Sequence, residues 1–235
     1  MRAAIASLPL AALLGCSNFD DLTRCHGRAC GVDLVAAWSF DEGAGLQVQD
    51  VSGNANDGVV DGATWAPGRF GGGLQFDGEN DSVLVADAAS LDPTGALTLE
   101  AWVRPSEETG TFRTIVVKEA TADTTYGLYT SPLPYFVLGF PARIAEGGAA
   151  PPVDSWTHIA GTYDGERLVL YVGGTPIVET AASGPVEPST GTLRIGGNAL
   201  WGEFFPGTID EVRVYSRALS AEEIQRDLET PIQAD

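Results

Sequence analysis

The sequence predicts an all-β fold in which two antiparallel sheets pack as a sandwich, with one short helix near the C-terminus. Three observations point to this class. Glycine supplies 29 of the 235 residues, and prolines and Asx-Gly pairs divide the chain into many short segments. Periodic helical patterning is nearly absent before Ser220. Residues 156–179 have the pattern of three consecutive antiparallel strands.

Residues 156–179, WTHIAGTYDGERLVLYVGGTPIVE, carry the clearest strand signal. The first strand alternates between two faces, and Asp164-Gly165 tolerates the positive φ angles of a two-residue hairpin turn. Gly173-Gly174 makes the next tight turn, before a third strand. Such a meander cannot bury its apolar face alone, so we expect the rest of the chain to supply a second sheet.

Strand patterns continue on both sides of this meander. Residues 97–104, LTLEAWVR, place an apolar residue at every second position, so that one face is apolar and the other carries Glu100 and Trp102. The other strands are short runs of β-branched and aromatic residues closed by glycine, proline or aspartate. They cover residues 34–40, 59–65, 73–76, 82–85, 111–118, 126–130, 135–140, 193–195 and 208–215.

One helix is predicted, over residues 221–228. Ser220 stands at the N-cap position with Glu223 three residues on, which is the pattern of a capping box. Ile224 and Leu228 follow at helical spacing and give the helix one apolar side. Residues 230–235 are predicted to form a loose tail.

The N-terminus has the pattern of a leader. Arg2 precedes a short apolar run that ends in Leu-Leu-Gly-Cys at Cys16, which resembles a bacterial lipoprotein signal whose cysteine is lipidated. A bilayer-spanning helix needs about 20 apolar residues, more than this run offers. The predicted organisation is a signal peptide over residues 1–16, a tether over 17–32 and one β-domain over 33–229. An ordinary signal peptide with a chance cysteine is the alternative.

Cysteine usage agrees with this organisation. Lipidation of Cys16 leaves Cys25 and Cys30, which are predicted to form a disulfide in an oxidising compartment. The alternative is a metal site, because Cys25-His26 and Cys30 offer zinc ligand types. Zinc needs a fourth ligand and is commonly held by paired Cys and His units, which this segment lacks, so the disulfide is favoured.

The chain is strongly acidic, with a formal net charge of -19 and Lys118 as its only lysine. Such a surface repels phosphate backbones and anionic lipid surfaces, so nucleic acid is excluded as a partner and the lipid anchor is the only predicted membrane contact. Acidity fits an extracytoplasmic protein or one that holds cations, and acidity for solubility alone is the alternative.

Several motifs resemble one domain family. They are WSFDEGAG, D-x-S-G-x-x-N-x-G, LQFDG, LTLEAWVRP, WTHIAGTYDG and GTIDEVRVYSRALSAEEI, which occur in this order between residues 33 and 228. They are similar to the LamG-like jellyroll domain of the concanavalin A-like lectin/glucanase superfamily. The resemblance implies a two-sheet antiparallel jellyroll, usually a non-catalytic module of secreted or surface proteins. Many members of the family bind calcium, and some bind glycans or protein partners.

Calcium is therefore the predicted cofactor. Ca²⁺ takes six to eight oxygen ligands from carboxylates, amides, carbonyls and water. By resemblance, Asp50 and Asp210 are the first candidate ligands, with Asn56 and Asp77 next, in loops or strand ends that a sandwich could bring together. The alternative is that these side chains hydrogen-bond their own backbone in Asx turns.

Two aromatic groups are candidates for ligand binding, because sugar sites place aromatic faces beside polar side chains. One loop holds Trp201, Phe204 and Phe205, and an exposed cluster there would mark a binding patch. The second group contains Tyr126, Tyr129 and Tyr135. The alternative is that these rings plug the end of the sandwich. Three tryptophans within strand patterns are predicted to be core residues: Trp38, Trp102 and Trp156.

The predicted function is a recognition or adhesion module of the bacterial cell envelope, lipid-anchored at the outer membrane or cell surface, whose partner is a glycan or a surface protein. One alternative is a polysaccharide-acting glycoside hydrolase, because the same superfamily contains glucanases. Such enzymes need two carboxylates about 5 Å apart in the retaining case, and the neighbours Asp210 and Glu211 face opposite sides of a strand. The chain is therefore predicted not to be an enzyme. A purely structural envelope lipoprotein is the other alternative.

Overall fold

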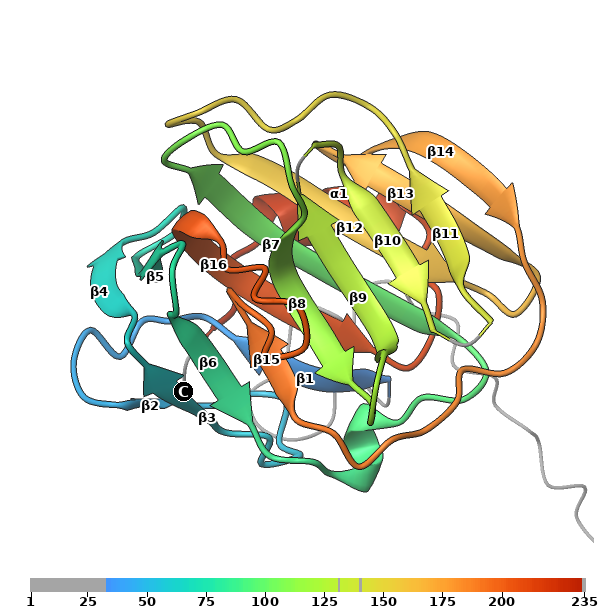
Figure 1. Cartoon of the computed structure of the whole chain (residues 1–235), viewed down its shortest axis with the longest axis horizontal. Coiled ribbons are helices and arrows are strands. Elements are labelled where there is room, and N and C mark those ends of the chain that lie inside the picture. Colours follow the sequence, from blue (N-terminus) through green and yellow to red (C-terminus); the bar gives the residue numbers. More distant parts are fainter. Residues whose placement is uncertain (1–32, 131, 140, 234–235) are drawn as a thin grey trace, which may run out of the picture. The chain divides into compact units, whose positions relative to one another are not determined.

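The computed structural model describes residues 33–130, 132–139 and 141–233. The chain divides into two units, Met1–Cys30 and Gly31–Asp235, and the second unit contains every described residue. Within that unit two antiparallel sheets of eight strands each lie one behind the other, with a single α-helix near the C-terminus (Figure 1). This confirms the predicted two-sheet antiparallel sandwich.

Sheet A contains the predicted meander. Its strands are β1 (Leu34–Trp38), β4 (Thr64–Pro67), β5 (Gly72–Asp77), β7 (Leu97–Pro105), β12 (Thr157–Tyr163), β13 (Arg167–Val172), β14 (Thr175–Ala181) and β16 (Pro206–Tyr215). They pair in the order β14-β13-β12-β7-β16-β5-β4. On the edge away from β7, strand β16 has two partners. Its first half pairs with β5, and its second half pairs with β1.

Sheet B lies in front of sheet A in Figure 1. Its strands are β2 (Gln47–Val48), β3 (Gly58–Asp61), β6 (Ser82–Val85), β8 (Arg113–Glu119), β9 (Thr124–Thr130), β10 (Tyr135–Leu138), β11 (Arg143–Glu146) and β15 (Leu193–Ile195). They pair in the order β11-β10-β9-β8-β15-β6-β3-β2. The late strand β15 is thus inserted between β8 and β6, which brings the loop after β15 onto the middle of the sheet.

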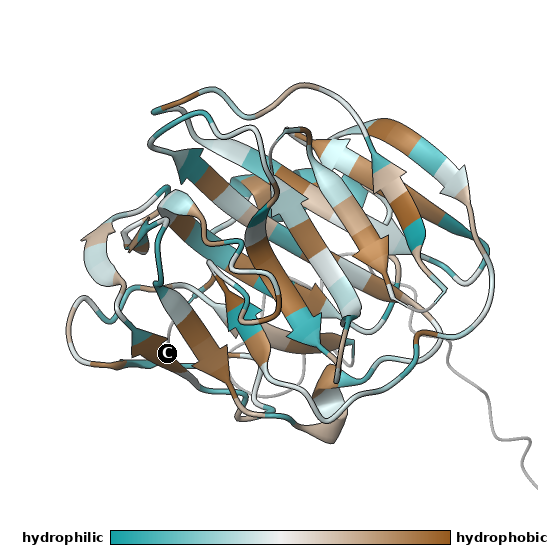
Figure 2. Ribbon diagram, viewed as in Figure 1, coloured by the Kyte–Doolittle hydropathy of each residue, from teal (hydrophilic) through white to brown (hydrophobic). Residues whose placement is uncertain are grey.

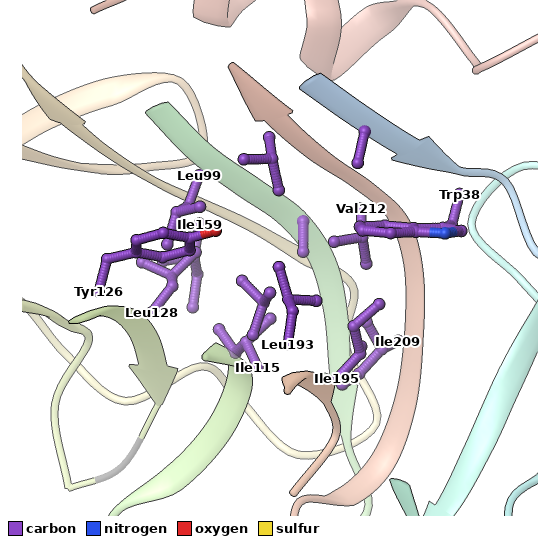
Figure 3. Packing of buried hydrophobic residues seen from close by; sticks show 14 of the residues in the cluster. Trp38, Leu99, Ile115, Tyr126, Leu128, Ile159, Leu193, Ile195, Ile209 and Val212 are labelled. Atoms are coloured by element: carbon purple, nitrogen blue, oxygen red, sulfur yellow. The ribbon is translucent and has the colours of Figure 1, made fainter. Parts of the chain in front are cut away.

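The hydrophobic core lies between the two sheets. Hydrophobic and hydrophilic residues alternate along the strands in Figure 2, because successive side chains point to opposite faces. From sheet A, Leu99 and Ile159 point toward Tyr126, Leu128 and other residues of sheet B (Figure 3), and all four are fully buried. The apolar face predicted for residues 97–104 is the face that enters this core.

Helix α1 (Ala221–Glu229) packs on the outer face of sheet A. Its predicted capping box is present, because the Ser220 side chain accepts from the Glu223 N–H and the Glu223 carboxylate accepts from the Ser220 N–H. Ile224 and Leu219 form a second apolar cluster with residues of β12 and β13. This contact explains why Ala160 is buried, although it lies on the face of β12 that points away from the core.

Several details differ from the prediction, which also missed the short strands β2 and β11. Residues 59–65 are not one strand but parts of β3 and β4, which belong to different sheets because Gly62 turns the chain with a φ of 89°. The predicted tail begins with docked residues, since the Ile232 N–H donates to Glu211 Oε2 at 2.6 Å and its side chain is only 8% exposed. Trp38 lies in the core as predicted. Trp102 is buried on the outer face of sheet A beside His158, and Trp156 is half-buried.

A group of charged side chains is buried on the outer face of sheet A. We call Glu100, His158, Glu211 and Arg213 the buried charge cluster. Arg213 Nη2 lies 2.8 Å from Glu211 Oε2, and its Nη1 lies 3.6 Å from Glu100 Oε1. His158 Nε2 lies 3.7 Å from Glu100 Oε2. Glu100, His158 and Arg213 alternate with core residues on their strands, so they lie on the opposite face from the core. Glu211 joins them where β16 is irregular and its own φ is 54°.

Burial shifts the pKa values of the carboxyls in this cluster, and of the neighbouring Asp210, in the opposite direction from that of His158. It raises the pKa of Asp210 and the pKa of Glu211 to about 7, and it raises the pKa of Glu100 well above its usual value. It lowers the pKa of His158 to about 3. Between pH 5 and 7 the folded chain therefore holds more protons on the three carboxyls than the unfolded chain, while the unfolded chain holds one more on the histidine.

We expect the domain to lose stability as the pH rises. A raised carboxyl pKa contributes stability below the unfolded pKa that is lost as the pH passes through the folded pKa, and three such groups outweigh one histidine of opposite sign. The melting temperature should be several degrees higher at pH 5.5 than at pH 8 in calorimetry. Asp210→Asn should flatten the slope, and a wild-type melting temperature that rises toward pH 8 would contradict the expectation.

Candidate aromatic binding site

Aromatic side chains gather on the outer face of sheet B. Leu128 and Phe136 point into the core, so the adjacent Tyr129, Tyr135 and Val137 point to the opposite face. They border a depression of about 260 Å³, which we call the aromatic hollow. Its lining residues are Phe112, Asp123, Thr124, Tyr129, Tyr135, Val137, Ala142, Trp201 and Glu203.

Three rings form a packed wall of the hollow. The ring centroids of Phe112 and Tyr135 are 4.9 Å apart, those of Tyr129 and Tyr135 are 5.7 Å apart, and those of Phe112 and Tyr129 are 6.2 Å apart. Gly127 lets the Tyr129 ring lie flat against β9, because a Cβ at that position would stand 2.6 Å from the ring. Trp201 differs from these rings because half of its surface, 50%, is exposed.

Asn198 positions the loop that carries Trp201. It is fully buried, and its Nδ2 donates to Thr114 Oγ1 and to Glu203 Oε2, both at 2.8 Å. Its Oδ1 accepts from the Trp201 N–H at 2.7 Å. One amide therefore ties the loop to β8 and fixes both the backbone at Trp201 and the carboxylate of Glu203.

A second contact anchors the same loop from the other side. Glu119 Oε1 accepts from the Ala199 N–H at 2.9 Å and lies 3.1 Å from Arg194 Nε. The Phe205 N–H donates to the Gly196 carbonyl at 2.8 Å and closes the base of the loop. The exposed indole is thus carried by a segment with several fixed points, which limits the entropy lost when a ligand binds it.

The hollow is electrostatically negative. Burial raises the pKa of Glu203, while the Asn198 hydrogen bond and the Arg113 charge oppose that shift. Burial raises the pKa of Tyr129 and the pKa of Tyr135, and nearby carboxylates including Glu203 and Asp123 raise them further. The phenols are therefore neutral near pH 7. Aromatic faces, hydroxyl donors and carboxylate acceptors together suit a ligand with apolar C–H faces and polar edges.

The structure brings together parts of both predicted aromatic groups. Trp201 lines the hollow with Tyr129 and Tyr135. Tyr126 and Phe205 are instead fully buried in the core, and Tyr126 donates its hydroxyl to the Leu91 carbonyl at 2.9 Å, so their assignment to the binding surface is corrected. Phe204 is half-buried beside Gly197 and does not line the hollow.

Sequence reasoning missed Phe112, Asp123 and Glu203 as site residues. Phe112 lies in the strand predicted over residues 111–118, whose pattern does not show where a binding site lies. Asp123 lies just before β9, where a loop pattern gives no side-chain direction. The available signal was Glu203 itself, a carboxylate two residues from an exposed-loop tryptophan. Sugar sites combine both residue types, so this spacing favoured their joint use.

Asp50 and Asn56, two of the predicted calcium ligands, lie together in the loop after β2. The Asp50 carboxylate accepts from the Ala37, Ser52 and Asn56 N–H groups, each at 2.9 Å. The Asn56 side chain donates to the Val35 carbonyl at 2.8 Å and accepts from Ser90 Oγ at 3.0 Å. Both side chains thus hold this loop onto β1.

Asp77 and Asp210 lie elsewhere. Asp77 Oδ1 accepts from the N–H groups of Glu79 and Asn80, as in an Asx turn. Asp210 Oδ2 accepts from the N–H groups of Arg69 and Phe70 at 2.7 and 3.0 Å. Within the described ranges no three His, Cys, Asp or Glu side chains gather as a metal site, so the predicted residues do not fit calcium as one set. Calcium binding by this chain stays a prediction.

The predicted lipidation site Cys16 and the predicted disulfide between Cys25 and Cys30 lie outside the described residues. They stay predictions. No helix in the described part of the chain has the length and apolar character needed to cross a bilayer.

The sequence matches a known family over much of its length. The family model described as the concanavalin A-like lectin/glucanases superfamily matches residues 77–225. Pappalysin-1 of Mus musculus is 32% identical over 80 residues, which is 32% of this chain and 5% of that protein. The chain therefore spans only a small part of this curated relative.

Solved structures share the fold at low sequence identity. Domain 4 of AbnA, a GH43 extracellular arabinanase from Geobacillus stearothermophilus in complex with arabinotriose, matches 83% of this chain and 98% of its own with a TM-score of 0.68 and 21% identity. The binding domain of Paraclostridial Mosquitocidal Protein 1 matches 83% of this chain and 52% of its own, with a TM-score of 0.66 and 18% identity. Trypanosoma rangeli sialidase in complex with sialic acid matches 83% of this chain and 32% of its own, with a TM-score of 0.63 and 21% identity.

These matches correct the prediction that the chain is not an enzyme. The fold that was used to set the chain apart from enzymes occurs in a domain of an arabinanase and in part of a sialidase. The argument from the neighbours Asp210 and Glu211 excludes only one pair of carboxylates, because a pair can also be assembled from different strands. The exclusion was therefore wrong.

Proposed function

Because the chain belongs to the concanavalin A-like lectin/glucanases superfamily, we propose that it recognises carbohydrate and that the aromatic hollow is its binding site. One observation carries the proposal, namely the exposed indole of Trp201 beside a wall of three packed rings and the carboxylate of Glu203. Apolar surface that gathers around a depression marks an interaction site, whereas a single exposed ring does not, so Trp201 and the ring wall support the proposal only together. Half-exposed tryptophan is also typical of residues that dominate binding energy.

The size and chemistry of the hollow suit one sugar residue of a longer chain. Its volume of about 260 Å³ is slightly below the range of roughly 300–1,000 Å³ that holds a drug-sized ligand. A pyranose or furanose ring can lay its C–H face on Trp201 and donate hydroxyl groups to Glu203 and Asp123. The fold relative from the arabinanase binds arabinotriose, which supports carbohydrate as the ligand class.

Truncation of Trp201 tests the proposal. In titration calorimetry against a panel of oligosaccharides, the wild-type domain should bind at least one member, and Trp201→Ala should weaken that binding at least about tenfold. Trp156→Ala is the matched control, because Trp156 is half-buried, stacks on Arg104 and does not line the hollow. Equal binding by both variants, or no binding by folded wild type to any sugar, would overturn the proposal.

We also propose that the domain is displayed outside the cytoplasm on a lipid anchor at Cys16. The acidic composition and the apolar run before Cys16 support this location. One acyl chain gives only marginal membrane binding, whereas two or more give stable attachment. Lipidation of Cys16 with several acyl chains would therefore hold the hollow close to the envelope.

A further inference from the structure

We propose that the aromatic hollow selects sugars that carry a free amino group, an inference that rests on the proposed function. The first support is the charge of its lining. Two carboxylates, Glu203 and Asp123, line the hollow, and none of its described lining residues is lysine, arginine or histidine. A bound ammonium group could therefore donate hydrogen bonds to these carboxylates and would touch no positively charged side chain.

Three cations of β8 and β15 do not line the hollow. Arg194 lies 3.1 Å from Glu119 Oε1 in the anchor of the loop. Lys118 is fully buried and bonds to Asp87 and to the Gly191 carbonyl. Arg113 lines the neighbouring depression beside Glu107 and Glu108, and its charge reaches Glu203 without entering the hollow. The local field thus favours a cation over an anion in the hollow.

The rings give the same preference. An ammonium group over the face of tryptophan or tyrosine is attracted by the ring quadrupole, and tryptophan is the strongest partner. Trp201 offers its exposed indole, and Tyr135 is half-buried at the same hollow. A hexosamine ring stacked on the indole can place its amine near one or both carboxylates.

The charge of the whole chain acts in the same direction. A formal net charge of -19 raises the local concentration of cationic ligands and repels uronic and sialic acids. The ligand class that satisfies the lining, the rings and the long-range field is therefore a glycan with unacetylated amino sugars. Acidic glycans are the class that all three features disfavour.

The test compares three trimers at pH 6.5, where a sugar amine is mostly protonated. They are glucosamine, N-acetylglucosamine and galacturonic acid trimers, titrated into the full-length protein by calorimetry. The glucosamine trimer should bind at least about tenfold more tightly than the N-acetylated trimer, and the galacturonic acid trimer should not bind.

Glu203→Gln isolates the charge. The amide keeps an oxygen that can accept from Asn198 Nδ2, so the loop keeps its anchor. This variant should lose most of the preference for the amine, so that the ratio of the two affinities falls toward one. Glu187→Gln, on an exposed residue outside the hollow, removes the same charge from the chain and should leave the preference unchanged.

The outcomes separate this inference from the proposed function. Equal binding of the first two trimers, unaffected by Glu203→Gln but lost in Trp201→Ala, would overturn amine selection and leave carbohydrate binding in place. Binding of the glucosamine trimer that falls equally in Glu187→Gln would reduce the preference to non-specific charge and would also overturn it. Failure of every sugar to bind would overturn both.

Discussion

Replacing Arg213 with methionine is expected to lower the free energy of unfolding by roughly 3–5 kcal/mol. Arg213 is only 5% exposed and is the cation of the buried charge cluster, 2.8 Å from Glu211 and 3.6 Å from Glu100. Its Nη2 also donates to the Thr230 carbonyl at 2.6 Å, which holds the segment after α1 on sheet A. Removing it leaves two buried carboxyls without their cation, and methionine fills the space without replacing the charge.

Urea unfolding followed by tryptophan fluorescence measures this loss as a lower midpoint with a similar slope. Arg167→Met is the control, because Arg167 pairs with Asp164 and Glu179 on the exposed surface of the same sheet. Such exposed pairs contribute little, so the control should unfold at the wild-type midpoint. An Arg213→Met variant as stable as the control would mean that the cluster is not held together by this arginine.

The second large effect is expected for Asp50→Ala. The Asp50 side chain is 5% exposed, and its carboxylate accepts from the Ala37 N–H at 2.9 Å, as well as from Ser52 and Asn56. Alanine leaves these donors without an acceptor, at about 1–3 kcal/mol for each one that water cannot reach. We therefore expect a loss of roughly 3 kcal/mol in urea unfolding.

Asp57→Ala serves as the control in the same loop, because Asp57 is exposed and its side chain accepts from the Asp50 N–H at 2.9 Å. This variant should lose clearly less stability than Asp50→Ala.

Melting both variants and wild type with Ca²⁺ and with chelator tests the calcium prediction. If Asp50 acts through hydrogen bonds alone, its variant loses the same stability in both conditions. A loss confined to the calcium samples would instead make Asp50 a ligand.

Local patterns in the sequence were sufficient to predict much of the fold. The period-2 run over residues 97–104 predicted the face that β7 buries in the core, and Ser220 with Glu223 predicted the start of α1. Both signals depend on neighbours within a few residues. The single strand predicted over residues 59–65 was wrong because the turn at Gly62 breaks it between two sheets. That division depends on which distant strand each half pairs with.

The candidate site was harder to predict because it depends on strand order. Trp201 meets Tyr129 and Tyr135 only because β15 inserts beside β8, which places the loop after β15 over the outer face of sheet B. One error was avoidable. Tyr126 and Tyr129 are an odd number of residues apart on one strand, so they point to opposite faces and could not share a surface.

The buried charge cluster shows a second limit of the sequence. Alternation placed Glu100 on the polar face of its strand, where a two-layer sandwich exposes side chains to water. In the structure α1 and the residues after it pack over part of that face, and Glu100 is fully buried. Hydrophobic periodicity cannot predict which outer face of a sheet a terminal segment will cover.

The most direct test of carbohydrate recognition is an NMR titration that follows the indole N–H signals of the five tryptophans. Trp201→Ala identifies the signal of Trp201 by its disappearance. Addition of a sugar that binds should shift the Trp201 signal in a saturable way and leave the signal of the fully buried Trp38 in place. A bound sugar that moves another tryptophan and leaves Trp201 unchanged would contradict the assignment of the aromatic hollow.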